Sequence, residues 1–542
     1  MFAQIFSSNC TQSPTCINFS DSTEPISKKI SDLQITPSSV CRAISNLDSS
    51  IASGPDSIPA IIFKKCGPEL SPILSKLFNK CLSESSFPEC WKCANIVPAF
   101  KNCGDRSDPS KYRPISLLPI VSKIFETLIN KKLTDHLESL GLLTDKQYGF
   151  RKNRSTADLL TVITERIYRA LDRCGEAKSI ALDISKAFDR VWHAGLLSKI
   201  RSFGISGKIY AIVKSFLSER QINVVLEGQH SKTYSITSGV PQGSILGPTM
   251  FLMFINDLPD NLVCNLVMYA DDSTLYSCLD EKSDNQNRLD LVNSLELDLD
   301  HITTWADNWH ISINSEKTKV LSINRYKNLD KLSISMSGKS LQESTSFRLV
   351  GLTISNELTW NEYINSIAKK ASMKVGTLYR ARSYLSPECI LHLYKSLIRP
   401  CMEYCCHIWA GAPATVLSLL DRIQRRVSNI IGPKFAANLQ SLHHRRNVAS
   451  LCLFYRYYNG MCSSELFDLV PPNKVFNRCT RLATNSHPFT VEVPSCQKKF
   501  YAASFFPRTS VMWNSLPLSC FPDSYNLNRF KSRVNRYLLT LK

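Results

Sequence analysis

The sequence lacks a long hydrophobic run. No stretch of about 18 or more nearly continuous apolar residues occurs, which is the length that a membrane-spanning helix needs. The first ten residues carry no basic segment and only a brief apolar run, so they do not read as a secretory signal. We therefore expect an intracellular protein, nuclear and/or cytoplasmic, that is not secreted and does not enter a membrane. In a reducing compartment its 20 cysteines are expected to be free thiols.

A complete zinc-binding pattern is also missing. Cys90 and Cys93 have the spacing of metal ligands, and residues 401–407 hold three cysteines and one histidine. Neither group has a clear second half elsewhere in the sequence. A zinc site is therefore not predicted.

Acidic residues are scarce in the last third of the chain. Residues 361–542 hold 25 Lys and Arg against 8 Asp and Glu, whereas residues 1–360 hold 40 against 38. Most of the net charge of +19 therefore lies in the last third. This asymmetry indicates a polyanionic partner for that region, and an inert basic surface is the alternative.

The chain is organised around the tetrapeptide Tyr269-Ala270-Asp271-Asp272, which lies between two apolar runs. Apolar flanks around turn-forming residues predict a strand, a tight turn and a second strand. Two adjacent carboxylates repel each other, and a divalent cation such as Mg²⁺ would remove that repulsion. An isolated Asp-Asp pair is more often an acidic turn in water, so the interpretation depends on the rest of the chain.

A second acidic position lies upstream, where Asp183 follows the apolar run of residues 180–182. That run predicts a buried strand, and the apolar spacing after it predicts a helix. A carboxylate at a strand end and a pair on a neighbouring hairpin could hold two metal ions about 4 Å apart. That arrangement suits in-line displacement at phosphorus.

These two stretches resemble motifs A and C of reverse transcriptases. Five further stretches resemble family motifs and occur in the family's order. They are a fingers motif at residues 111–118, the next motif at 147–151, motif B at 238–248, motif D at 314–318 and the primer grip at 347–352. The residues of these motifs most resemble those of the polymerases of non-LTR (LINE-type, jockey-like) retrotransposons.

The resemblance implies an α+β right-hand polymerase with fingers, palm and thumb, followed by a helical basic C-terminal region. Helical spacing is expected over residues 119–140, 156–171, 287–309, 364–384 and 386–401, and Thr36-Pro37 is typical of a helix start. The expected domains are a flexible N-terminus (1–35), an N-terminal helical extension (36–90), the reverse transcriptase domain of fingers and palm (91–355), a helical thumb (361–432) and a basic C-terminal region (433–542).

The implied activity is that of an RNA-directed DNA polymerase of a mobile element, which extends a primer 3′-hydroxyl with dNTPs. The implied partners are an RNA template, a DNA primer and dNTPs. The implied cofactor is a pair of Mg²⁺ ions, with Mn²⁺ as an alternative. Two other functions stay open: an inactive, element-derived nucleic-acid-binding protein, and an RNA-dependent RNA polymerase or intron maturase of the same fold.

The resemblance also assigns roles to single residues. Asp183, Asp271 and Asp272 would hold the metals, and Lys317 of motif D would protonate the leaving pyrophosphate. For Lys317 the alternative is a surface lysine. The basic turn with Arg151 and Arg154 would contact the template backbone, with a solvated loop as the alternative. The predicted template and primer residues are Arg151, Arg154 and Gly351.

Five residues are predicted to bind the incoming nucleotide: Lys101, Arg113, Phe188, Gln242 and Gly243. Lys101 and Arg113 would hold the triphosphate, unless Arg113 pairs with a structural carboxylate. Phe188 would begin the helix after Asp183, with its ring under the sugar. A ring there would clash with a ribose 2′-hydroxyl, which speaks against RNA synthesis. Packing in the core is the alternative for Phe188.

Two modules of a complete element are not recognisable in this sequence. No endonuclease-like domain precedes residue 36, and no ribonuclease H module is identifiable in the last third. A truncated open reading frame is one explanation for both.

Overall fold

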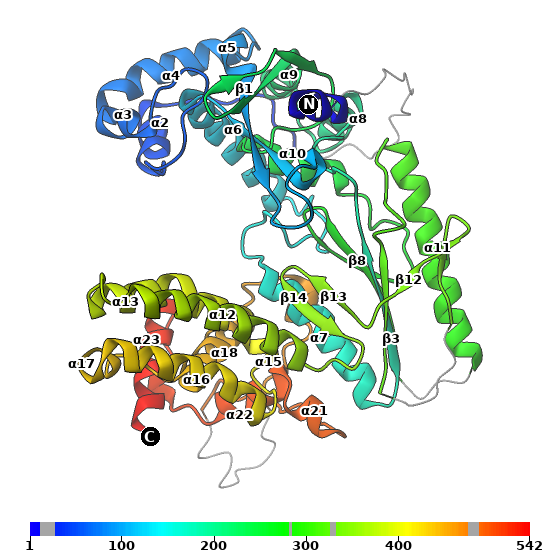
Figure 1. Cartoon of the computed structure of the whole chain (residues 1–542). Coiled ribbons are helices and arrows are strands. Elements are labelled where there is room, and N and C mark those ends of the chain that lie inside the picture. Colours follow the sequence, from blue (N-terminus) through cyan, green and yellow to red (C-terminus); the bar gives the residue numbers. More distant parts are fainter. Residues whose placement is uncertain (11–27, 281–284, 326–331, 475–486, 542) are drawn as a thin grey trace. The chain divides into compact units, whose positions relative to one another are not determined.

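The computed structural model describes residues 1–10, 28–280, 285–325, 332–474 and 487–541. These residues form two compact units, each assembled from three stretches of the chain (Figure 1). The first unit contains residues 1–150, 184–261 and 301–314, and the second contains 151–183, 262–300 and 315–542. Helices and strands mix in both units, which confirms the predicted α+β class. Among the described residues, no helix has both the length and the apolar composition needed to cross a membrane.

The first unit is built on a sheet in which β1 pairs with β2 and β4, and β4 pairs with β5 and β6. Its strands are β1 (Cys93–Phe100), β2 (Tyr112–Leu117), β4 (Arg220–Leu226), β5 (Gln229–His230) and β6 (Tyr234–Ile236). Its helices are α1 (Phe2–Asn9), α2 (Pro37–Ser45), α3 (Ala60–Lys65), α4 (Gly67–Ser83), α5 (Glu89–Lys92), the 3-10 helix η1 (Pro109–Lys111), α6 (Ile120–Ser139), α8 (His193–Ser202), α9 (Gly207–Leu217) and α10 (Leu246–Ile255).

The first ten residues belong to the core of this unit. Ala3 and Phe6 of α1 are buried against the sheet residues Ile96, Ile222 and Ile236. A flexible N-terminus over residues 1–35 was therefore wrong for residues 1–10, because the helix buries its apolar face on the sheet. Residues 11–27 lie outside the described part of the chain.

The second unit contains a sheet of five strands in the order β12-β9-β3-β8-β7. The strands are β3 (Glu176–Leu182), β7 (Asn265–Tyr269), β8 (Asp272–Leu279), β9 (Lys319–Ile323) and β12 (Gln342–Glu343). All neighbours are antiparallel except β12 and β9, which are parallel. Two small hairpins join them: β10 (Ser335–Met336) with β11 (Lys339–Ser340), and β13 (Ser346–Leu349) with β14 (Leu352–Ser355).

Helices make up the remainder of the second unit. α7 (Thr156–Asp172) packs on β3, β7 and β8, and α11 (Asn285–Asn308) continues from the second unit into the first. The others are α12 (Asn361–Ala381), α13 (Pro387–Leu393), the π-helix η2 (Tyr394–Ile398), α14 (Arg399–Glu403), α15 (Cys406–Trp409), α16 (Ala414–Ile431), α17 (Pro433–Ala436), α18 (Leu442–Tyr458), α19 (Ser464–Phe467), α21 (Lys499–Ala502), α22 (Phe505–Asn514), the 3-10 helix η3 (Leu518–Cys520) and α23 (Leu527–Thr540).

Three buried carboxylates join α7 to the end of the chain. Asp158, Glu165 and Asp172 are seven residues apart in turn, so they share one face of the helix. The Tyr457 hydroxyl donates to Asp158 at 2.9 Å, and the Tyr501 hydroxyl donates to Glu165 at 2.9 Å. The backbone amides of residues 497 and 498 donate to Asp172 at 3.0 and 2.7 Å. The described residues after position 456 are therefore packed, through these contacts, into the unit that holds the five-stranded sheet.

Aromatic side chains of the C-terminal region form part of this core. Tyr455 stacks on Phe530 with ring centroids 4.1 Å apart, and both rings are buried. Trp513 and Tyr457 are also fully buried. These four rings are therefore unavailable for stacking with nucleic-acid bases.

Candidate functional site

Two neighbouring strands bring the three predicted metal-binding aspartates to one end of the five-stranded sheet. Leu182, the last residue of β3, is paired with Ser273 of β8, and Tyr269 is paired with Asp272. Asp183 therefore follows directly on β3 beside the hairpin that carries Asp271 and Asp272. Neighbouring strands lie about 4.8 Å apart, which is a suitable separation for carboxylates that share metal ions.

The hairpin between β7 and β8 has a loop of two residues, Ala270 and Asp271. Ala270 has a φ of +58°, a backbone conformation that residues with a side chain rarely adopt. Such conformations persist where the surrounding structure enforces them, and they cluster at functional sites. The turn fixes the direction in which Asp271 leaves the sheet.

The residues present fit a divalent cation in chemistry and in backbone placement. Three aspartates on two segments of chain lie at one end of the sheet, and hard cations take carboxylate oxygens. In the conformation of the structure, no group of three or more His, Cys, Asp or Glu side chains among the described residues is arranged to hold a metal ion. The carboxylates would therefore need to turn toward a shared ion.

Lys317 lies at the same end of the sheet. Its Nζ is 3.6 Å from Asp183 Oδ2, and the two side chains are 68% and 41% exposed. An ion pair this exposed contributes little to stability. Its position beside a predicted metal ligand is compatible with the predicted proton-donating role.

In the first unit, Phe188 lies in a turn ahead of α8, which begins at His193. The expectation that Phe188 starts the helix was wrong. Its backbone is bonded to the motif B loop instead, because the Phe188 carbonyl accepts a hydrogen bond from the Val240 amide at 2.8 Å. The half-buried Phe188 ring stacks on Phe251 of α10, with centroids 4.4 Å apart and planes at 21°. The rings of Phe150 and Phe188 are nearly perpendicular, with centroids 6.4 Å apart.

Motif B is held against β2 and against the turn that contains Phe188. The Gln242 carbonyl accepts from the Ser116 amide at 2.7 Å. Gly243 has a φ of +126°, and a Cβ there would lie 2.4 Å from the Ser116 carbonyl oxygen. Only glycine therefore fits at this close approach. The Gln242 side chain donates to Asp189 at 2.7 Å.

Cationic groups lie near motif B in the same unit. Arg113 is exposed on β2 and makes no ion pair within the described residues. The alternative that it pairs with a structural carboxylate is therefore not seen among these residues. Lys101 Nζ donates to the Ser110 carbonyl at 3.0 Å. Burial, followed by the charges of Arg190 and Lys101, lowers the pKa of Lys186. Sequence reasoning missed Lys186 and Arg190, although both follow Asp183 within seven residues.

The predicted template and primer residues are in the second unit. Arg151 and Arg154 lie in the loop before α7. Gly351 and Val350 form the two-residue turn between β13 and β14, with φ values of +95° and +36°. The Tyr404 hydroxyl donates to the Val350 carbonyl at 2.5 Å, so this turn is anchored to the helical part of the unit.

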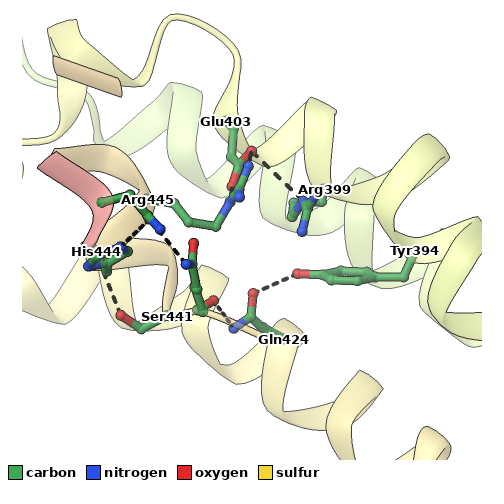
Figure 2. Close-up of polar contacts among 9 residues, drawn as sticks. Tyr394, Arg399, Glu403, Gln424, Ser441, His444 and Arg445 are labelled. Carbon is green, nitrogen blue, oxygen red and sulfur yellow. Dashed lines mark hydrogen bonds and ion pairs between the residues drawn. The ribbon is translucent and has the colours of Figure 1, made fainter. Parts of the chain in front are cut away.

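A polar cluster connects α14, α16 and α18 (Figure 2). Arg445 binds Glu403 through two of its nitrogens, and Arg399 Nε lies 4.0 Å from the same carboxylate. The Tyr394 hydroxyl donates to Gln424 at 2.8 Å. Arg445 therefore serves the packing of the helices, and not every basic residue of the last third is available to a polyanion.

Exposed cations remain on two helices that pack together. α12 carries exposed Lys369, Lys370 and Arg380, and α16 carries exposed Arg422 and Arg425.

Comparison with known proteins places these features in a family. The model of the family "Reverse transcriptase (RNA-dependent DNA polymerase)" matches residues 101–354, which include the three aspartates, motif B and both hairpin turns. Residues 101–354 of the chain therefore form a reverse transcriptase domain.

The chain is similar to polymerases of non-LTR retrotransposons. It is 30% identical over 410 residues to "RNA-directed DNA polymerase from mobile element jockey" of Drosophila melanogaster, covering 73% of this chain and 44% of that protein. It is 28% identical over 432 residues to "Probable RNA-directed DNA polymerase from transposon X-element" of the same species, covering 78% and 47%. The chain thus spans just under half the length of these relatives.

Among solved structures, an apo telomerase from Candida tropicalis, truncated from its C-terminal domain, overlaps 56% of this chain and 61% of that chain. The TM-score is 0.34 at 13% sequence identity.

Proposed function

We propose that the chain is an RNA-directed DNA polymerase of a mobile element, which extends a primer 3′-hydroxyl with dNTPs. The observation that carries the proposal is the pairing of Leu182 with Ser273, because it sets Asp183 beside Asp271 and Asp272. A nucleic-acid-binding protein has no need of three carboxylates of like charge at one end of a sheet. The proposed partners are an RNA template, a DNA primer and dNTPs, and the proposed location is the nucleus and/or the cytoplasm.

Asp183 and Asp271 are the proposed direct ligands of two Mg²⁺ ions, with Asp272 beside them and Mn²⁺ as an alternative metal. When bound, such ions activate the attacking 3′-hydroxyl and neutralise the leaving pyrophosphate. Lys317 would give a proton to that pyrophosphate, and the 3.6 Å between its ammonium and Asp183 supports this role.

The first unit supplies the proposed nucleotide-binding residues. Lys101 and Arg113 hold the triphosphate, and the exposed guanidinium of Arg113 suits a bidentate contact with phosphate. Gln242 and Gly243 approach the nucleotide, and Phe188 excludes a ribose 2′-hydroxyl. In the second unit, Arg151, Arg154 and Gly351 contact template and primer.

The test is primer extension by the purified chain on poly(rA)/oligo(dT) with Mg²⁺. We expect extension with dTTP, little extension with UTP, and none in excess chelator. An inactive nucleic-acid-binding protein would bind the primer–template without extending it. An RNA-synthesising polymerase would prefer UTP, and either result would overturn the proposal.

A further inference from the structure

Gln242 has a buried partner to which the motifs assign no role. Asp189 follows Phe188 directly, is 7% exposed, and accepts a hydrogen bond from Gln242 Nε2 at 2.7 Å. Its own carbonyl accepts from the Ser238 hydroxyl at 3.3 Å, and a Cβ at Gly239 would lie 2.6 Å from that carbonyl oxygen. Asp189 is therefore packed against the motif B loop through both its side chain and its backbone.

We propose that Asp189 is a positioning residue that sets which end of the Gln242 amide faces the nucleotide; this rests on the proposed polymerase function. An ionised carboxylate only accepts hydrogen bonds, so Nε2 of the amide must face Asp189. Oε1 of Gln242 is then turned away from Asp189 and is the acceptor offered to the nucleotide. Without Asp189, either Oε1 or Nε2 of Gln242 could face the nucleotide.

The structure also contains a second group, Arg220, that could hydrogen-bond the Gln242 side chain in the opposite orientation. A cavity of about 30 Å³ is lined by Asp189, Gln242 and Arg220, among others. Arg220 is 1% exposed, and its Nη2 has no hydrogen-bond partner among the described residues. A buried N–H without an acceptor is costly, so Arg220 would attract a freed Gln242 carbonyl. Asp189 holds the amide away from this alternative.

The ionised form of Asp189 has cations around it. Burial is the largest influence on the pKa of Asp189 and raises it overall, although the Gln242 hydrogen bond and the charges of Lys186, Lys101 and Arg190 act in the opposite direction. The hydrogen bond and these cations favour the ionised carboxylate, the form that can only accept hydrogen bonds.

The test is a double-mutant cycle in the full chain, read as KM and kcat for dTTP in primer extension. Asp189→Leu removes the acceptor at similar volume, whereas Asp189→Asn retains an acceptor oxygen. Asp189→Leu and Gln242→Ala should each raise KM by about fivefold, the worth of one hydrogen bond. The double variant should be no worse than Gln242→Ala alone, because Asp189 acts through Gln242. Asp189→Asn should raise KM by less than Asp189→Leu does, because its amide keeps an acceptor oxygen but can also turn its donor toward Gln242.

Fold-changes that multiply in the double variant would overturn the proposal, as would a loss of kcat at unchanged KM, which indicates a smaller folded fraction. If Asp189→Leu does not fold, Asp189→Ser takes its place in the cycle with the same expectations. A wild-type chain that does not extend the primer contradicts the proposed function and this role together. Wild-type extension with multiplying effects contradicts the positioning role alone.

Discussion

The ring of Phe188 lies flat against the ring of Phe251, with centroids 4.4 Å apart and planes inclined by 21°. Phe251 is fully buried in α10, whereas Phe188 is half-buried. One face of Phe188 therefore packs on the core, as the packing alternative expects, and the remainder of the ring is accessible, as the predicted contact with the sugar requires. A ring supported in this way can act as a rigid wall, and a rigid wall is what discrimination against an added hydroxyl requires.

Replacing Phe188 by Val should weaken sugar discrimination while deoxynucleotide extension is retained. The smaller side chain leaves room for a ribose 2′-hydroxyl, so the ratio of kcat/KM for dCTP over CTP should fall by about 10- to 100-fold. Steady-state primer extension with each nucleotide measures the ratio. An unchanged ratio would mean that Phe188 is only a packing residue, and the argument against RNA synthesis would lose its main support.

Replacing Phe251 by Leu should have a smaller effect in the same direction. Losing the stacked partner lets the Phe188 ring move, so the dCTP/CTP ratio should fall by about two- to tenfold, the worth of one aromatic pair. Phe254→Leu is the matched control, because Phe254 is buried in the same helix but contacts Trp305 and Trp309. Equal effects of the two variants would show a general loosening of α10 and not support for Phe188.

The C-terminal region should be essential for the stability of the second unit. Asp158 is fully buried and is paired with Arg456 and Tyr457, so Asp158→Asn should lower the free energy of unfolding by about 3 kcal/mol. Chemical denaturation measures the loss. Asp280→Asn is the control: it breaks an exposed pair with Arg173 and should cost less than about 1 kcal/mol. Similar costs for the two variants would contradict a buried junction between α7 and the end of the chain.

The exposed cations of α16 should contribute to nucleic-acid binding through phosphates. Replacing Arg422 and Arg425 by Gln should reduce the slope of log affinity against log salt by about 1 to 2. Fluorescence anisotropy of a labelled primer–template over a salt series measures the slope, and Lys64→Gln with Lys65→Gln on α3 is the charge-matched control. These point variants are cleaner than removing residues 361–542, because that deletion would also take away the partners of α7. An unchanged slope would mean that Arg422 and Arg425 do not contact the phosphates of the primer–template.

The sequence predicts the parts of this structure that depend on neighbouring residues. The expected helices at 119–140, 156–171 and 287–309 correspond to α6, α7 and α11 within about two residues at each end. The expected strand–turn–strand around Ala270 and Asp271 is present as β7 and β8. Thr36 does start α2, where its side chain accepts from the Ser39 amide.

The features that the sequence does not predict depend on contacts between residues far apart in the chain. α1 is stabilised by sheet residues about 90 to 230 positions later, so its own eight residues give little sign of it. The helix expected over residues 386–401 is interrupted by the π-helix η2, which immediately precedes α14 and Pro400. Proline lacks the amide hydrogen that would continue the regular pattern. The Asp189–Gln242 hydrogen bond joins residues 53 positions apart, and no local pattern predicts it.

Primer extension by Asp271→Asn, made together with its thermal unfolding, tests the proposed metal site most directly. We expect no extension above background, because the variant loses a charge from that site. In chelator its unfolding temperature should equal or exceed that of the wild type, because adjacent carboxylates no longer repel each other. Mg²⁺ should raise the unfolding temperature of the wild type more than that of the variant. Extension by Asp271→Asn at a rate near that of the wild type would contradict the assignment of these carboxylates to catalysis.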